Sequence, residues 1–276
     1  MSTAALEVKL PRYERAGRVT QVRVLLSEWT KLVSLRSTRW SLAAATVLGI
    51  GLPCVFAAVT ASHWHSMSLH ERLDRHPLDI ALAGVNVAQL AIAVLGVLVI
   101  TGEYSTGMIR ASFTAVPKRL PVLWGKGAVF AAVTFLLTLP AVLISFFASQ
   151  AILRNHHILQ ISFSHPGVAR SVIGGAGYLV LIGLFALAIG AIVRNTAGGI
   201  AAFAALFFVI PPLMNILPAS WNDTISPYLP DAAGRSIFSL NPGAHSLSPW
   251  LGFTLFVGYT AAAIAIAAVL LVRRDT

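Results

Sequence analysis

The stretch "LAGVNVAQLAIAVLGVLVITGEYSTGMIRASFTAVPKRL", residues 82–120, decides the fold of this chain. Its first nineteen residues carry no charge, and an apolar run of that length can cross the hydrocarbon core of a membrane as a helix. An acid, two glycines and a basic segment containing a proline follow, and another apolar run begins directly after them. The pattern predicts two membrane spans joined by a polar connection.

Composition extends this prediction to the whole chain. The 276 residues are 57% hydrophobic and only 11% charged, whereas soluble domains carry about 25% charged residues. A net charge of +10 would suit nucleic acid in a soluble protein, but here the charges separate apolar runs, so we expect no nucleic-acid partner. The single cysteine, Cys54, excludes an intrachain disulfide and is expected to be a small buried hydrophobe.

Six segments are long and apolar enough to span a membrane. They cover residues 40–61, 82–101, 122–149, 172–193, 197–217 and 250–272. We therefore expect an all-α polytopic membrane protein, with a flexible tail over residues 1–19 and one transmembrane domain over residues 20–276.

Lysine and arginine predict how the spans are oriented. Fifteen of the twenty Lys and Arg residues lie on the side that carries both termini, counting Lys126 at the foot of the third span. Because basic residues accumulate on the cytoplasmic side, both termini are predicted to be cytoplasmic. Six spans agree with this, since an even number of spans returns the chain to the side on which it starts.

Residues 20–37, "TQVRVLLSEWTKLVSLRS", are predicted to form an amphipathic helix that lies flat at the cytoplasmic surface. Its apolar residues recur at three- and four-residue steps, namely Val22, Leu25, Leu26, Trp29 and Leu32. Its polar face carries Arg23, Ser27, Lys31 and Ser34. The helix is either a membrane anchor alone or an anchor with a further role.

The connection after the second span is predicted to hold a second short helix. Ser105 or Thr106 can cap its start, Gly107 permits a tight turn and Pro117 ends it. Its apolar edge would consist of Ile109, Phe113 and Val116. Two interpretations stay open: the edge docks into a groove on a partner protein, or it lies on lipid.

The outer loops carry all eight histidines. His63 and His65, with nearby carboxylates, could bind zinc or copper, but their spacing matches no standard ligand pattern, so solvated histidines are expected and no metal site is predicted. The longest outer loop, residues 218–249, contains "DAAGRSIFSL", which predicts a short helix at the outer surface.

The cores of the predicted spans contain no acid, base or histidine. Asn86 and Gln89, three residues apart, are predicted to share a helix face and either line a substrate path or bond a neighbouring helix. Without a buried titratable group, a proton-coupled carrier and an intramembrane protease are both disfavoured. Gly125 and Lys126 lack the upstream glycine of a phosphate-binding loop, so the chain is not expected to be an enzyme that hydrolyses ATP.

Five segments together resemble the membrane subunit of type-2 ATP-binding-cassette (ABC) transporters, especially short six-span actinobacterial members. They are "LLSEWTKLVSLRST" (residues 25–38), "ITGEYSTGMIRASFTAVPKRLPVLWGK" (100–126), "VRNTAGGIA" (193–201), "YLPDAAGRSIF" (228–238) and "RRD" (273–275). They occur in order and at matching places in a six-span layout, and the resemblance covers nearly the whole chain. It specifies no substrate.

The resemblance implies a role for each cytoplasmic helix. The helix over residues 20–37 would be the elbow helix beside an ATPase subunit, with Trp29, Lys31 and Arg36. Residues 103–119 would hold the coupling helix that fits into that subunit. Its implied residues are Glu103 and Tyr104 at the entry, Gly107 and Pro117 at the turns, Ile109 and Phe113 as buried contacts, and Arg110 and Arg119 as polar contacts.

The resemblance also implies an assembly of two permease chains, identical or related, with two ATPase chains in a bacterial plasma membrane. ATP and magnesium would bind to the ATPase, and this chain would hold no cofactor of its own. Members of the family mostly export their substrates. Two alternatives remain: a membrane sensor or scaffold that responds to metal or pH through the outer histidines, and an ion-coupled secondary carrier.

Overall fold

The structure is a computed structural model that describes residues 21–34, 36–108, 119–158, 160–240, 243 and 245–273. Within those ranges the chain is helical and contains no strand, which confirms the predicted all-α class. The long helices are α2 (Arg36–His63), α4 (Pro77–Ser105), α6 (Arg119–Asn155), α7 (Val168–Val193) and α12 (Pro249–Arg273).

Six helical segments of the described chain are long and apolar enough to cross a membrane, as predicted. The helices extend beyond the apolar runs, by as much as a turn or more at α4 and α6. The fifth span is built from α8 (Thr196–Ala204), a π-helical turn η2 (Ala205–Val209) and α9 (Ile210–Met214). Pro211 and Pro212 follow η2 and cannot donate backbone hydrogen bonds, which explains the irregular turn at that point.

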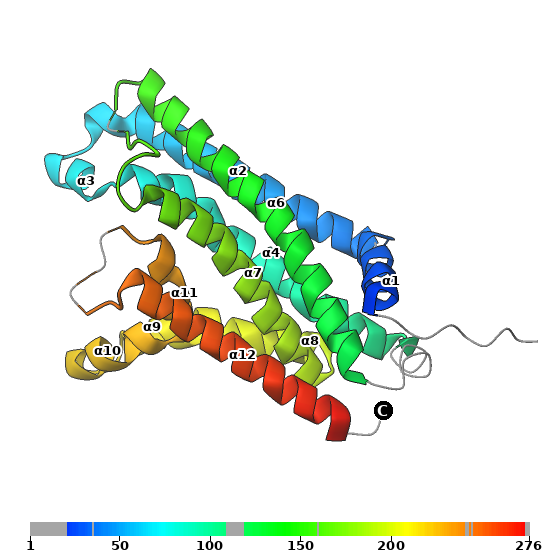
Figure 1. Cartoon of the computed structure of the whole chain (residues 1–276). Helices are drawn as coiled ribbons and strands as arrows, with labels where there is room; N and C mark the ends of the chain where they lie inside the picture. The colour runs from blue at the N-terminus through cyan, green and yellow to red at the C-terminus, as the bar shows by residue number, and fades with distance from the viewer. Residues whose placement is uncertain are drawn as a thin grey trace, which may run out of the picture.

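Helices α4 and α7 form the centre of the bundle (Figure 1). Helices α2 and α6 pack on one side of them, while α8 and α12 pack against α7 on the other. The two central helices meet closely at Gly96, where an added Cβ would lie 2.3 Å from the carbonyl oxygen of Gly183. Small residues at this crossing let the backbones approach, which drives helix association in a membrane.

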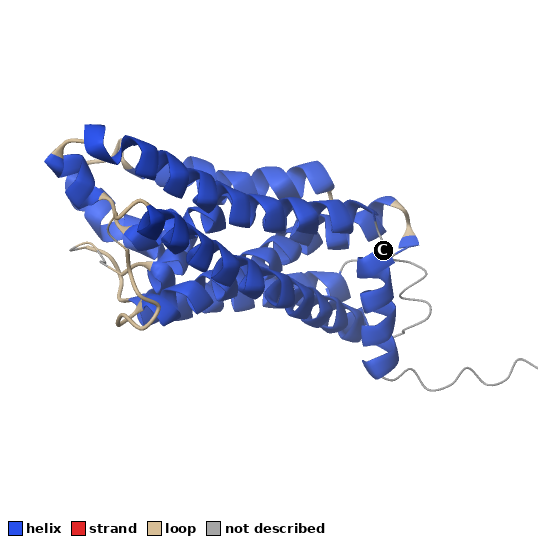
Figure 2. Ribbon diagram, turned by 90° about the horizontal axis from the view of Figure 1, so that it is seen from above, coloured by secondary structure: helices blue, strands red, loops and turns tan. Residues whose placement is uncertain are grey.

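The two ends of the bundle differ (Figures 1 and 2). At one end, called here the α1 end, helix α1 (Gln21–Ser34) lies across the direction of the long helices, and α4 and α12 end there. The other end, called here the α3 end, holds η1 (Trp64–Ser66), α3 (Leu69–Asp74), α10 (Ala219–Ile225) and η3 (Ser226–Tyr228).

The segment "DAAGRSIFSL" does form short helices, α11 (Pro230–Arg235) and η4 (Ser236–Phe238), but the prediction that they lie at the surface is wrong. They are tucked into the bundle against α7 and α12. Gly234 makes this packing possible, since an added Cβ there would lie 2.6 Å from the Tyr178 ring. This insertion is not predictable from the sequence, because the segment lies in a long polar loop.

Candidate functional site

A closed ring of four alternating charges joins three helices at the α1 end. Lys126 Nζ of α6 lies 2.5 Å from Glu28 Oε2 of α1 and 2.9 Å from Glu103 Oε1 of α4. Lys31 Nζ of α1 lies 2.7 Å from Glu28 Oε1 and 3.1 Å from Glu103 Oε1. We call Glu28, Lys31, Glu103 and Lys126 the charge quartet.

The charge quartet is mostly shielded from solvent. The side chains of Lys126, Glu28 and Glu103 are 3%, 4% and 9% exposed, while that of Lys31 is 28% exposed. Burial works against the charged form of Lys31, yet Glu28 and Glu103 raise the pKa of its ammonium above the usual value. Because two acids balance two bases, the ring is stable only when it is complete, and removal of one member would leave a buried unpaired charge.

Close packing of α1 on α6 brings Glu28 and Lys31 into the charge quartet. An added Cβ at Gly125 would lie 2.9 Å from Val24 Cγ1, so this glycine lets α1 approach α6 closely. The face of α1 that packs on the bundle carries Val24, Glu28 and Leu32 at four-residue steps. A helix, α1, does form within the residues predicted to be an amphipathic helix, but four of the five residues of the predicted apolar stripe are exposed, all except Leu32.

The opposite face of the α4 terminus is held by a second set of contacts. The guanidinium of Arg194, in the turn between α7 and α8, lies 5.2 Å from the centroid of the Tyr104 ring. Arg194 Nη2 also donates to the carbonyl oxygen of Leu270 in α12, at 3.3 Å. Thr196 Oγ1 donates to Thr101 Oγ1 at 2.8 Å. The last turn of α4 is therefore tied to four other parts of the bundle.

Helix α4 then ends at Ser105, with Thr106 as its C-cap. The hydroxyls of Ser105 and Thr106 both donate to the carbonyl oxygen of Gly102 and so close the last turn of α4. The short helix that either residue was predicted to cap lies in residues 109–118, outside the described residues. Gly107 has φ of 71°, a left-handed conformation that glycine adopts freely, which agrees with the predicted tight turn.

Several residues assigned by resemblance to the coupling helix lie outside the described residues, namely Ile109, Arg110, Phe113 and Pro117. Arg119 begins α6. Of the residues assigned to the elbow helix, Trp29 is 46% exposed, Lys31 belongs to the charge quartet, and Arg36 is exposed at the start of α2. Glu103 and Tyr104 contact their own chain, so neither is a free surface contact.

A second polar network crosses the interior nearer the α3 end. The hydroxyl of Tyr178 donates to Gln89 Oε1 at 2.6 Å and lies 3.2 Å from Asp231 Oδ1. Arg235 Nε lies 2.8 Å from the same Asp231 oxygen. Burial raises the pKa of the Asp231 carboxyl above its usual value, although Arg235 and Tyr178 favour its charged form.

The two amides of the predicted substrate path separate in the structure. Gln89 is fully buried and accepts a hydrogen bond from Tyr178 of the neighbouring helix α7. Asn86 is exposed on the surface of the bundle. Residues three apart on a helix lie about 60° from each other, so the two amides are neighbours on α4, but the boundary between interior and surface runs between them. Cys54, predicted to be buried, is half-buried.

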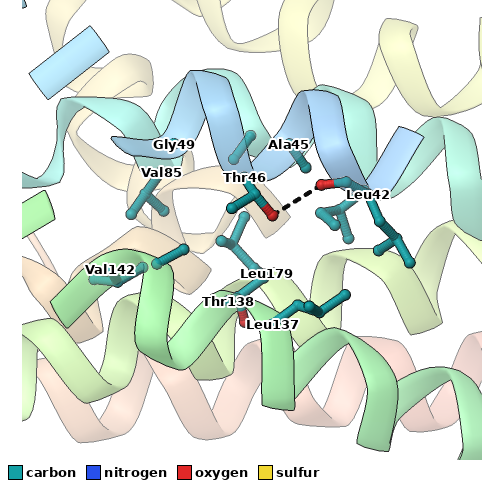
Figure 3. A pocket seen from close by; sticks show the side chains of 12 residues that line it. Leu42, Ala45, Thr46, Gly49, Val85, Leu137, Thr138, Val142 and Leu179 are labelled. Carbon is teal, nitrogen blue, oxygen red and sulfur yellow. Dashed lines mark hydrogen bonds between the residues drawn. The ribbon is translucent and has the colours of Figure 1, made fainter. Parts of the chain in front are cut away.

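A hollow among α2, α4, α6 and α7 is small (Figure 3). Its volume is about 20 Å³, enough for roughly one water molecule. Val85, Leu137 and Leu179 contribute apolar side chains to it, and Thr46 donates its hydroxyl to the carbonyl oxygen of Leu42 at 2.9 Å. Such a space does not hold a solute in this conformation.

The charge quartet also corrects the premise that the spans contain no charge. Lys126 lies within the predicted third span and is 3% exposed, and Glu103 lies in the last turn of α4. The sequence pattern predicts only an orienting role for Lys126 and assigns no role to Glu28. Isolated acids beside basic residues at the ends of apolar runs predict that ion pairs form there. They do not predict which acid pairs with which base.

The histidines of the α3 end are not gathered around a common point. Among the described residues, no group of three or more His, Cys, Asp or Glu side chains could hold a metal ion. His63 Nδ1 lies 3.0 Å from the carbonyl oxygen of Val59, in its own helix. His65 is exposed in η1.

Comparison with models of protein families and with curated proteins found no match for this chain. The fold and the side-chain contacts therefore carry the functional argument.

Proposed function

We propose that this chain is the membrane-spanning permease subunit of an ATP-driven ABC transporter, most consistent with an exporter in a bacterial plasma membrane. In this proposal the α1 end faces the cytoplasm, where a separate ATPase subunit docks on residues 103–119. The observation that carries the proposal is the charge quartet, which fixes the α4 terminus next to the connection that would bind the ATPase.

The physical argument concerns how a force applied to a connection reaches the spans. A flexible attachment would absorb the motion of a partner, whereas the last turn of α4 is held on one face by the charge quartet and on the other by Arg194. A displacement of this turn must move α1, α6 and the α7–α8 turn with it. The sequence contains no phosphate-binding loop motif, so in this proposal a partner supplies the energy of ATP hydrolysis.

Asn86 supports a second permease chain in the same assembly. Its side chain is exposed from the bundle, about 14 Å along α4 from Pro77 at a rise of about 1.5 Å per residue. An amide at this depth facing lipid would leave its hydrogen bonds unmade, whereas a neighbouring helix can satisfy them. A second copy or a related chain would cover this part of α4.

Affinity purification from the cells that make the protein tests the proposal directly. The tagged wild-type chain should bring down a cassette ATPase in equimolar amount, and the purified complex should hydrolyse ATP. The matched control is the same purification with Phe113→Asp, which places a charge on the predicted docking edge. Recovery of the wild-type chain without any ATPase, under detergent conditions that preserve other membrane complexes, would contradict the proposal.

An ion-coupled carrier is the second candidate, and the buried Asp231 network favours it. A carboxyl whose pKa is raised by burial can bind a proton that crosses the membrane with a solute. The two functions differ in a reconstitution experiment: the isolated chain in vesicles would accumulate a solute under a proton gradient only if it were such a carrier. The sensor alternative has no histidine cluster to support it among the described residues.

A further inference from the structure

A cavity at the α1 end opens beside the charge quartet, between α1, α4 and α6. Its volume is about 260 Å³. Apolar side chains line one part of it, including Leu32, Leu98, Val99 and Val129, and Lys31, Glu103 and Lys126 line another. Three hydroxyls complete the polar part, those of Ser34, Ser105 and Thr106.

One polar atom of a residue that lines this cavity has no hydrogen-bond partner among the described residues. Glu103 Oε1 accepts from both lysines, but Glu103 Oε2 is buried and makes no hydrogen bond with the described residues. The side chain of Glu103 is more than nine-tenths buried, and it lines the cavity. A buried carboxylate oxygen without a hydrogen-bond donor raises the free energy of the folded chain. A ligand that carries an N–H or O–H group could remove this cost.

The position of the cavity defines the rest of the ligand. The apolar run of α4 ends at Ile100, and Glu103 follows within one helical turn, at the depth where lipid hydrocarbon gives way to headgroups. Helix α1 lies across the bundle at the same level. A ligand there would place an apolar chain on the apolar wall and a polar head on the charge quartet.

We propose that this cavity binds an aminophospholipid of the phosphatidylethanolamine class. Its primary ammonium would donate to Glu103 Oε2, and its phosphate would lie near Lys31, the most exposed cation of the quartet. A zwitterionic head matches a quartet with no net charge. A choline head has the same charge but no N–H donor, so it would leave Glu103 Oε2 unsatisfied. This inference does not depend on the proposed transport function.

A substitution at Gly102 can fill the cavity and so test the proposed site. Gly102 lines it, and an added Cβ there would meet no heavy atom within 4 Å. Gly102→Leu should therefore occupy the space without a clash and should favour the helix. Gly258→Leu is the matched control, because Gly258 is also in a long helix with no atom within 4 Å of an added Cβ, but lies in α12 away from the cavity.

The experiment uses the delipidated full chain in detergent, titrated with dioleoyl phosphatidylethanolamine or dioleoyl phosphatidylcholine, with bound lipid counted by native mass spectrometry. Wild type and Gly258→Leu should bind the ethanolamine lipid at least tenfold more tightly than the choline lipid. Gly102→Leu should lose this high-affinity site, and Glu103→Gln should lose the preference between headgroups. Phosphoethanolamine without acyl chains should bind far more weakly, which separates a membrane lipid from a free headgroup.

Equal affinity of the wild-type chain for the two lipids would overturn the proposal, as would an unchanged preference in Gly102→Leu. Since Glu103 also supports the fold, the wild-type headgroup comparison and Gly102→Leu decide the outcome if Glu103→Gln does not yield folded protein.

Discussion

Lys126 shows how a single residue can organise the α1 end. Its ammonium reaches Glu28 of α1 and Glu103 of α4 from α6, and it is nearly inaccessible to solvent. In such a setting the attraction between the partners offsets the cost of removing each charge from water only while all partners are present. Tyr178 has a comparable position nearer the α3 end, where its hydroxyl joins Gln89 and Asp231.

Replacing Lys126 with methionine should destabilise the folded chain by about 3–5 kcal/mol, because Glu28 and Glu103 lose a shared buried partner. Titration with denaturing detergent measures this loss. Arg23→Met is the control: Arg23 is exposed on α1, and a surface change of this kind costs within about 0.5 kcal/mol. Equal stability of the two variants would show that the charge quartet contributes nothing.

Tyr178→Phe should cost about 1–3 kcal/mol, since it leaves the buried Gln89 oxygen without its donor. Tyr259→Phe removes a hydroxyl that bonds to the Tyr228 carbonyl oxygen at an exposed position, and should cost less. Thermal unfolding of both variants in the same detergent tests the order. A larger loss for Tyr259→Phe would contradict the importance of the interior network.

Elements were predicted better than the contacts between them. The six spans and α1 followed from apolar runs and helical period, because each run has one stable conformation in a membrane. The packed face of α1 was not predictable, since a helix in contact with lipid exposes its apolar residues and can bury an acid such as Glu28. The insertion of α11 was missed for the related reason that its polar residues find partners only in the folded bundle.

At the crossing of α4 and α7, Gly96→Ala should be strongly destabilising, because the added methyl would lie 2.3 Å from a backbone oxygen that cannot move aside. We expect a loss of at least about 2 kcal/mol, in the range of overpacked cores. Gly258→Ala, in a helix with open space, should be neutral or slightly stabilising. Melting temperatures of the pair test this: similar values would mean that the helices do not cross at Gly96.

At the scale of the whole molecule, the two ends of the bundle are built differently. At the α1 end, buried salt bridges hold the end of α4 against its neighbouring helices. The α3 end holds short helices, histidines and exposed aromatic residues such as Trp221. The proposed transport function would use this asymmetry: the ATPase would act on the α1 end, and the solute would leave at the α3 end.

Cysteine labelling tests the sidedness that the proposal assumes. In a Cys54→Ala background, a membrane-impermeant maleimide added to intact cells should label Ser220→Cys on α10 but not Ser34→Cys on α1, because the two exposed positions lie at opposite ends of the bundle. Permeabilised cells should show labelling of both. Labelling of Ser34→Cys in intact cells would place the α1 end outside and remove the docking surface from the cytoplasm.

The most direct test of the central claim is the rate of ATP hydrolysis by the purified complex of this chain with its ATPase, reconstituted in vesicles. The account predicts that Phe113→Asp lowers the solute-coupled rate at least tenfold while the chain stays folded by size-exclusion chromatography. Trp221→Asp, an equally drastic change to an exposed aromatic residue at the opposite end, should leave the rate unchanged. Wild-type hydrolysis in the Phe113→Asp complex would contradict the claim that work enters the bundle through the connection after α4.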